Sequence, residues 1–205
     1  MDRRLALATI LAVPVLYAIN GWLSGRVDPL AAAGLGLVAY WVFLGAALSR
    51  MDRDYLYGLL PLQSPGRLIN LALALPVILV GAATFRLLGS VILPPHVILA
   101  AAMAALLHAL LEEMFWRGAL IGSAGDRPAA LALVLYWIFH LAWLGLAPLE
   151  VGVGPTLLVL SPLALGGAWT AARIASGTVG SGIMAHAGFN LFAFVAIAAL
   201  AQPAA

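Results

Sequence analysis

The chain has 205 residues, of which 64% are hydrophobic and 9% are charged. A composition with so little charge excludes an ordinary soluble fold and indicates a polytopic membrane protein. The ten basic residues are all arginine and stand against eight acids, a surplus that the charge asymmetry of a membrane explains, so we expect a lipid bilayer and no nucleic acid as partner. The absence of cysteine excludes disulfides and thiolate metal sites.

Seven apolar runs approximate the ~20 residues that a helix needs to cross a bilayer. They cover residues 5–22, 29–48, 68–88, 95–121, 128–146, 155–174 and 180–201. The first resembles a signal peptide but is too long and lacks a small-residue cleavage site, so we expect a retained span. The polar connection 49–67 fits either a short interfacial helix or a plain solvated loop. We expect one all-α domain over 1–205, a bundle of about seven transmembrane helices or eight helices in all.

The arginines predict the orientation of this bundle. With a cytoplasmic N-terminus, two arginines, Arg26 and Arg86, fall outside, and the other eight fall inside. The inner set consists of Arg3, Arg4, Arg50, Arg53, Arg67, Arg117, Arg127 and Arg173. Seven spans then place the C-terminus outside. Because the chain is rich in alanine, leucine and arginine and has no lysine, we expect a prokaryotic plasma membrane.

Two adjacent carboxylates, Glu112 and Glu113, interrupt the apolar run 95–121. Hydrophobic burial does not explain them, because acids inside a membrane are unfavourable and usually mark a functional site. Glu113 and Arg117 lie four residues apart on a helix and can pair, whereas Glu112 is rotated about 100° away. We therefore expect Glu113 to be tied to Arg117 and Glu112 to be free for another task.

Three more polar residues lie inside later spans: His140 on the run 128–146, and His186 with Asn190 on the run 180–201. At ~1.5 Å per residue, all three lie between the inner surface and the middle of the membrane, as Glu112 does. His186 and Asn190 are four residues apart and share a helix face, and the same spacing places Tyr136 below His140. We expect these spans to bring their polar residues together.

The patterns Glu112-Glu113-x-x-x-Arg117, Tyr136-x-x-x-His140 and His186-x-x-x-Asn190 resemble the three motifs of the CPBP family of CAAX-processing and bacteriocin-processing intramembrane proteases. The resemblance covers a core of about 95–202, and the first half of the chain matches no motif. The second motif normally begins with phenylalanine, where this chain has Tyr136.

This resemblance implies a metal-independent glutamic endopeptidase that acts near a C-terminal or membrane-embedded segment of a protein or peptide. Glu112 and His140 would activate a water, and His186 and Asn190 would stabilise the oxyanion. The chemistry agrees, because hydrolysis of a peptide needs a base for the water and donors aimed at the carbonyl oxygen. Glu113, Arg117 and Tyr136 would support the site.

Two alternatives stay open. His108 lies one turn before Glu112 and would be a supporting partner or part of a metal site; a zinc version of the protease would use Glu112, His140 and His186, with His108 completing the set. No His-Glu-x-x-His signature is present. The other alternative is a non-catalytic immunity or scaffold protein, or a carrier with Glu112 and His140 as a proton relay, although no paired halves are visible. Prenylated tails, sorting-signal tails and leader peptides all remain as substrates.

Overall fold

The computed structural model describes residues 3–122, 126–146 and 155–201, and all the regular structure in these ranges is helical. The helices are α1 (Arg3–Ser24), α2 (Pro29–Leu48), α3 (Arg53–Gly58), α4 (Arg67–Leu88), α5 (Pro95–Glu112), α6 (Asp126–Phe139), α7 (Pro155–Ser176) and α8 (Gly180–Leu200). α5 continues directly into a π-helix, η1 (Glu113–Ala119), and α6 continues into a 3-10 helix, η2 (His140–Gly145). The predicted all-α bundle is confirmed, and the polar connection 49–67 contains a short helix, α3.

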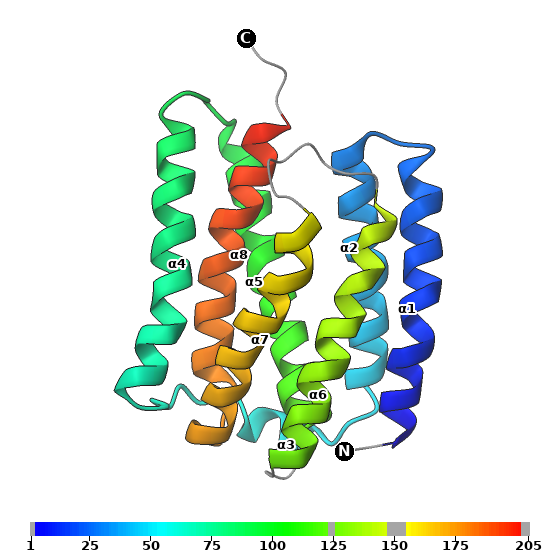
Figure 1. The fold of residues 1–205 in the computed structure, drawn as a ribbon, viewed down its shortest axis with the longest axis vertical. Helices are drawn as coiled ribbons and strands as arrows, with labels where there is room; N and C mark the ends of the chain where they lie inside the picture. Colours follow the sequence, from blue (N-terminus) through cyan, green and yellow to red (C-terminus); the bar gives the residue numbers. More distant parts are fainter. Residues whose placement is uncertain (1–2, 123–125, 147–154, 202–205) are drawn as a thin grey trace.

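The long helices stand side by side and alternate in direction, so α1 begins at one end of the bundle and α8 finishes at the other (Figure 1). We call the end where α1 begins, and where α3 lies, the arginine-rich end. Its exposed arginines are Arg3, Arg4, Arg50, Arg53, Arg67 and Arg127. Arg117 and Arg173, which were expected with them in the inner set, are instead buried within the bundle because they make internal hydrogen bonds.

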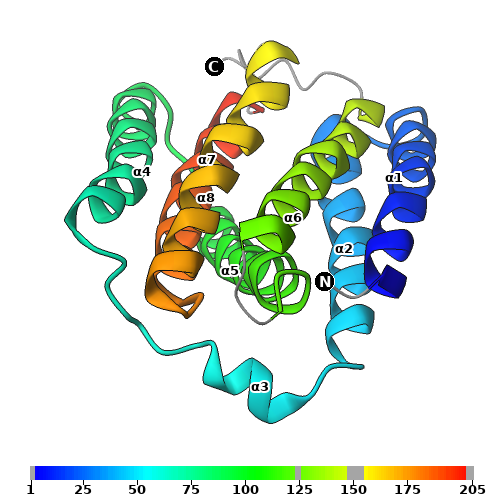
Figure 2. The same cartoon turned by 60° about the horizontal axis from the view of Figure 1, so that its bottom comes forward.

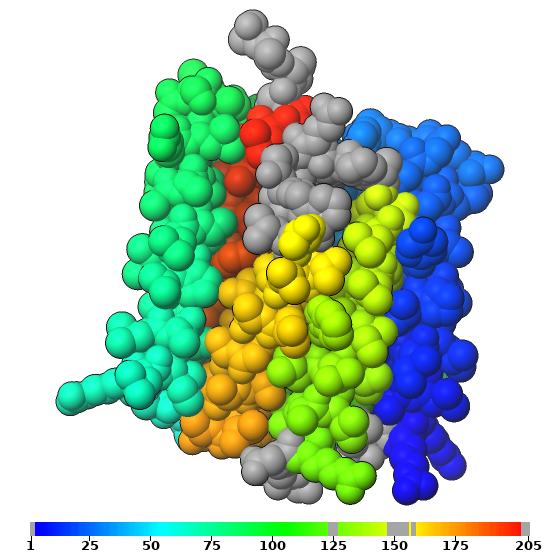
Figure 3. All heavy atoms as spheres, viewed as in Figure 1, coloured from blue at the N-terminus to red at the C-terminus, as the bar shows by residue number. Residues whose placement is uncertain are grey.

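Within the described ranges, six helical segments are long and apolar enough to cross a membrane. They are Arg3–Ser24, Pro29–Leu48, Arg67–Leu88, Pro95–Ala119, Arg127–Gly145 and Gly180–Leu200. Large apolar side chains cover their outer surfaces, for example Leu11 of α1 and Leu71 of α4, at 59% and 66% exposure. Figure 3 shows one outer face of the bundle, on which α4, α8, α7, α6 and α1 are visible. An apolar exterior of this extent is what contact with lipid requires.

Local sequence signals set several helix ends. Asp28 caps α2 by accepting a hydrogen bond from the Ala31 backbone N–H at 3.0 Å, and Pro29 occupies the first helical position. Asp52 caps α3 in the same way through Tyr55 N–H at 2.7 Å. Gly177 follows α7 with a φ of 74°, a left-handed conformation that glycine adopts without steric cost. Residues of the connections therefore determine where these helices begin and end.

The core that surrounds α5 and η1 is rich in aromatic side chains. α5 packs against α8 and α2, and Figure 2 shows it in the middle of the bundle between these two helices. The buried rings of the core come from α2, η1, α6 and α7: Tyr40, Phe115, Trp116, Tyr136, Phe139 and Trp169. Rings lose little conformational entropy when they are fixed, so this core holds the polar groups among them in defined positions.

Candidate active site

The two adjacent glutamates lie where α5 becomes the π-helix η1, and both are fully buried. Arg117 Nη1 donates to Glu113 Oε1 at 3.2 Å, as the four-residue spacing predicts. The same guanidinium donates to the Gly166 carbonyl of α7 at 3.3 Å and lies 4.1 Å from the ring centre of Tyr136. A charge this deeply buried is tolerated because these contacts replace its hydration.

Arg173 of α7 holds the end of the π-helix. Its Nε donates to the Arg117 carbonyl at 3.1 Å, and its Nη2 donates to the Gly122 carbonyl at 3.2 Å. These carbonyls lie at the C-terminal end of a helix, where backbone acceptors have no partner within the helix. Arg173 was counted from the sequence only as an inner-side charge; its structural role is to fix the segment that carries Arg117.

Glu112 is not free, contrary to the expectation from the sequence. Tyr40 of α2 donates its hydroxyl to Glu112 Oε1 at 2.6 Å, and Trp116 Nε1 donates to the Tyr40 oxygen at 2.8 Å. His108 Nε2 lies 3.5 Å from the same carboxylate oxygen. The reason is long-range packing of α2 against α5, which a helical-wheel argument does not include. The other oxygen, Oε2, has no hydrogen-bond partner among the residues that the structure describes.

His186 joins the two carboxylates. Its Nδ1 lies 2.9 Å from Glu113 Oε1, and its Nε2 lies 3.6 Å from Glu112 Oε2. The imidazole stacks on Trp169 of α7, with 3.7 Å between ring centres and 14° between planes. The stack and the hydrogen bond together fix the ring, so Nε2 is aimed at the oxygen of Glu112 that has no partner.

Asn190 lies one turn beyond His186 on α8 and is 6% exposed. Its amide nitrogen is buried and finds no hydrogen-bond partner within the described ranges. A buried donor without a partner costs about 1–3 kcal/mol, so its presence in a native fold calls for an explanation such as a catalytic role or a bound water. Together with Glu112 Oε2, Asn190 therefore gives the site an unused donor as well as an unused acceptor.

His140 lies at the junction of α6 and η2 and is half-buried. Its Nδ1 is 2.9 Å from the Tyr136 carbonyl, which only accepts, so Nδ1 carries the proton and Nε2 has the lone pair. The ring also packs edge-on against Tyr136, with centres 4.3 Å apart. Tyr136 thus contacts both His140 and Arg117.

Three side chains could together hold a metal ion: His108, Glu112 and His186, whose ligand atoms all lie within 4.8 Å of one another. This set differs from the expected Glu112, His140 and His186. Trp41 Nε1 donates to His108 Nδ1 at 3.2 Å. Because an indole nitrogen only donates, Nδ1 is the acceptor and the proton of a neutral His108 is on Nε2. The nitrogen that faces Glu112 is therefore occupied by a proton, and the group fits a metal poorly.

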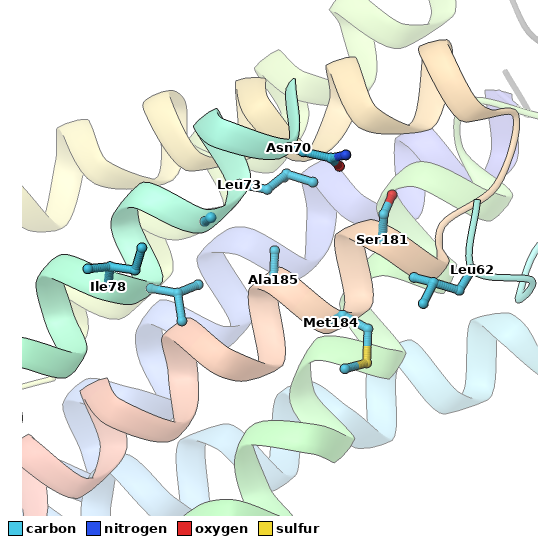
Figure 4. A pocket seen from close by; sticks show the side chains of 9 residues that line it. Leu62, Asn70, Leu73, Ile78, Ser181, Met184 and Ala185 are labelled. Carbon is cyan, nitrogen blue, oxygen red and sulfur yellow. The ribbon is translucent and has the colours of Figure 1, made fainter. Parts of the chain in front are cut away.

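An open groove of about 390 Å³ runs between α4 and α8 (Figure 4). Its walls are apolar apart from Asn70 and Ser181, and the buried hydroxyl of Ser181 has no hydrogen-bond partner. Figure 4 shows Ser181 on α8 and Asn70 on α4 among the residues that line the groove. None of the glutamates or histidines of the candidate site lines this groove.

Four aromatic residues of the site were not predicted from the sequence: Tyr40, Trp41, Trp116 and Trp169. One signal was present: tyrosine and tryptophan in membrane proteins concentrate at the two interfaces, whereas Tyr40 and Trp41 are the twelfth and thirteenth residues of a 20-residue span. Polar aromatic side chains at mid-span need hydrogen-bond partners there. The position of the pair therefore indicated a buried polar site, although not which residues it serves.

A family model described as type II CAAX prenyl endopeptidase, Rce1-like, matches residues 94–192. The matched range begins one residue before α5 and includes the two glutamates, His140, His186 and Asn190. No curated protein and no solved structure matches the chain.

Proposed function

The chain belongs to the CPBP family of intramembrane CAAX proteases, and from that premise we propose that Glu112 is the base of a metal-independent peptide hydrolysis. The substrate is a protein or peptide whose scissile bond lies near a C-terminal or membrane-embedded segment. The apolar groove beside α8 suits the hydrophobic part of such a substrate.

One observation carries this proposal: Glu112 Oε2 is buried, accepts no hydrogen bond from any described residue, and lies 3.6 Å from His186 Nε2. The site holds two carboxylates against one guanidinium, so one further proton shared between Glu113 Oε1 and His186 Nδ1, which lie 2.9 Å apart, makes the cluster neutral, as a low-dielectric interior favours. In that state Glu112 is an ionised base, and His186 Nε2 carries a proton and is a donor. A base and a donor so close together suit attack on a carbonyl group.

The reaction then follows in two steps. Glu112 Oε2 takes a proton from a water, and the hydroxide forms a bond to the carbonyl carbon, while Asn190 Nδ2 and His186 Nε2 donate to the developing oxyanion. The C–N bond then breaks, and Glu112 returns its proton to the leaving amine. His140 holds the water by accepting a hydrogen bond at Nε2, the nitrogen that its bond to the Tyr136 carbonyl leaves unprotonated.

A zinc enzyme is the second candidate, because His108, Glu112 and His186 bring three ligand atoms within 4.8 Å. We rank it lower for the reason given above: Trp41 places the proton of His108 on the nitrogen that would bind the metal. Metal analysis of the purified protein separates the two. Stoichiometric zinc whose removal by a chelator abolishes cleavage would establish the metal enzyme.

The test of the proposed function is Glu112→Gln, which keeps the shape of the side chain and removes its basicity. Cleavage of an internally quenched farnesylated CAAX peptide should fall by roughly 10²–10⁴-fold, the contribution of a positioned base. Thermal unfolding in detergent should show that the variant still folds. The matched control is Asp54→Asn on the exposed surface of α3, which should cleave like the native protein.

Near-native cleavage by Glu112→Gln would refute the assignment of the base, whereas equal inactivity of the native protein and the variant on every peptide would favour the non-catalytic or proton-relay alternatives. The substrate class is addressed by comparing the farnesylated peptide with its unprenylated twin and with a leader peptide. Proteomics of membrane-protein termini, in cells with native protein or Glu112→Gln, then identifies the natural substrates.

A further inference from the structure

Two adjacent residues of α2, Tyr40 and Trp41, both direct their hydrogen bonds toward the Glu112 carboxylate, one directly and one through His108. Both lie outside the range 94–192 that the family model matches. We propose that this pair is a positioning device that commits Oε1 of Glu112 to the protein and leaves Oε2 as the oxygen that takes the proton. The inference rests on the proposed function of Glu112.

The direction of the first hydrogen-bond chain is fixed by its members. Trp116 Nε1 only donates, so the Tyr40 oxygen accepts from it at 2.8 Å. A phenol has a single proton, and the 2.6 Å contact with Glu112 Oε1 takes it. The chain therefore runs from Trp116 through Tyr40 to Glu112 and ends on one carboxylate oxygen. Hydrogen bonds in such chains polarise one another, and those to an ionised acceptor are the stronger ones.

The second chain reaches the same oxygen. Trp41 Nε1 donates to His108 Nδ1 at 3.2 Å, which places the proton of a neutral His108 on Nε2. This protonated nitrogen is the one that lies 3.5 Å from Glu112 Oε1. Both hydrogen-bond chains begin at an indole N–H, which can only donate. The donors and acceptors along each chain therefore cannot be exchanged while His108 is neutral.

The two oxygens of Glu112 are thus unequal before any substrate arrives. Oε1 accepts from Tyr40 and lies near the His108 proton, whereas Oε2 has no hydrogen-bond partner and faces His186. Rotation of the carboxylate is opposed, because Tyr40 is fully buried and its ring packs against Phe139 and Trp143. α2 therefore decides which lone pair is presented to the water.

The kinetic test is Tyr40→Phe, which keeps the packed ring and removes only the hydroxyl. With the farnesylated CAAX peptide, kcat should fall about 10- to 100-fold, as loss of one hydrogen bond to a charged group predicts, while KM stays within about twofold. Trp116→Phe should cause a smaller fall on its own and no further fall in the Tyr40→Phe background, because it acts through the same oxygen. The control is Tyr57→Phe, at a tyrosine that is 67% exposed.

A spectroscopic test needs no substrate. In protein with ¹⁵N-labelled histidine, His108 should show a protonated Nε2 and His140 a protonated Nδ1, opposite tautomers in one molecule. Trp41→Phe should release His108 from its single tautomer and leave His140 unchanged, whereas Trp22→Phe, at an exposed tryptophan, should change neither. A merely structural role of Trp41 would not move a tautomer.

Different results would overturn the role of Tyr40 and Trp41 and the proposed function of Glu112. Cleavage that persists in Glu112→Gln would remove the function and the inference with it. Loss of cleavage in Glu112→Gln together with native kcat in Tyr40→Phe would overturn the inference alone. A native His108 with its proton on Nδ1 would also overturn it.

Discussion

At Asn190 we expect a substitution to change catalysis without changing stability. Its amide nitrogen is buried and satisfies nothing in the fold, so Asn190→Ala should not lower the thermal unfolding temperature. If the nitrogen stabilises the oxyanion, the same change should lower kcat by roughly 10²–10³-fold, the usual effect of one lost donor. The measurement is kcat on the farnesylated CAAX peptide beside a melting curve.

Asn20 provides the contrasting asparagine. It is also buried, at 1% exposure, and its Nδ2 donates to the Ala142 carbonyl at 2.9 Å, which joins α1 to η2. Asn20→Ala should therefore destabilise the protein by about 1–3 kcal/mol and leave kcat of the folded fraction unchanged. A fall in stability for Asn190→Ala that equals that of Asn20→Ala would contradict the role given to Asn190.

Contacts between residues close together in the sequence could be predicted, whereas contacts between distant residues could not. The pair Glu113–Arg117 depends only on helix geometry over four residues, and the structure confirms it. The bond from Tyr40 to Glu112 joins positions 72 residues apart, and the Trp169–His186 stack joins two different helices. Such contacts follow from how helices pack, which one sequence does not specify.

At the scale of the element, the segment Glu113–Ala119 is the main departure from expectation. The apolar run 95–121 predicts one continuous α-helix, whereas the structure changes to a π-helix directly after Glu112, with Leu120 N–H bonded to the Phe115 carbonyl at 3.0 Å. π-helical turns occur mostly as short segments, frequently at functional sites. This one is held by tertiary contacts, from Arg173 to the Arg117 carbonyl and from the Arg117 guanidinium to α7, so the local sequence carries no signal for it.

The helix α7 offers a matched pair of glycines to test this packing. A Cβ at Gly166 would lie 2.8 Å from the Tyr136 ring and 3.0 Å from Arg117 Nη2, whereas a Cβ at Gly167 would meet nothing within 4 Å. Gly166→Ala should therefore destabilise the protein by about 1–3 kcal/mol, the typical cost of overpacking, and displace Arg117. Gly167→Ala should be neutral or stabilise by about 0.5–1 kcal/mol, because alanine favours a helix.

Thermal unfolding of both variants in one detergent gives the comparison, and cleavage by Gly166→Ala reports the displacement of Arg117. Equal melting temperatures for the two variants would mean that α7 does not pack against the guanidinium as closely as described.

At the scale of the whole molecule, the alternation of the long helices separates the exposed arginines cleanly. Six lie at the arginine-rich end, and Arg26 and Arg86 lie toward the other. The apolar runs alone predicted this arrangement, because each is long enough to cross the membrane and the connections are short. Because Arg117 and Arg173 are buried, the number of exposed arginines at the arginine-rich end falls from the expected eight to six, which still exceeds the two at the other end.

We predict that the arginine-rich end faces the cytoplasm, with the N-terminus on that side. The chain has no cysteine, so single cysteines report topology without background. Gln63→Cys lies in the connection before α4 at the arginine-rich end, and Ile92→Cys, at a site 95% exposed, lies in the connection after α4. In intact cells an impermeant maleimide should label Ile92→Cys only, and permeabilised cells should show both. Labelling of Gln63→Cys in intact cells would reverse the orientation.

The position of Glu112 along its helix also has a consequence for length. Seven residues of η1 separate it from the end of that helix on the arginine-rich side, which is roughly 10 Å at about 1.5 Å per residue. An extended peptide covers about 3.3 Å per residue, so about three residues span that depth. A chain that enters from this side must be unfolded over at least that reach before a bond meets the carboxylate. The depth of Glu112 would thus set a minimum length of unfolded chain, and a protein whose folded part lies closer than this to the bond would not be cleaved.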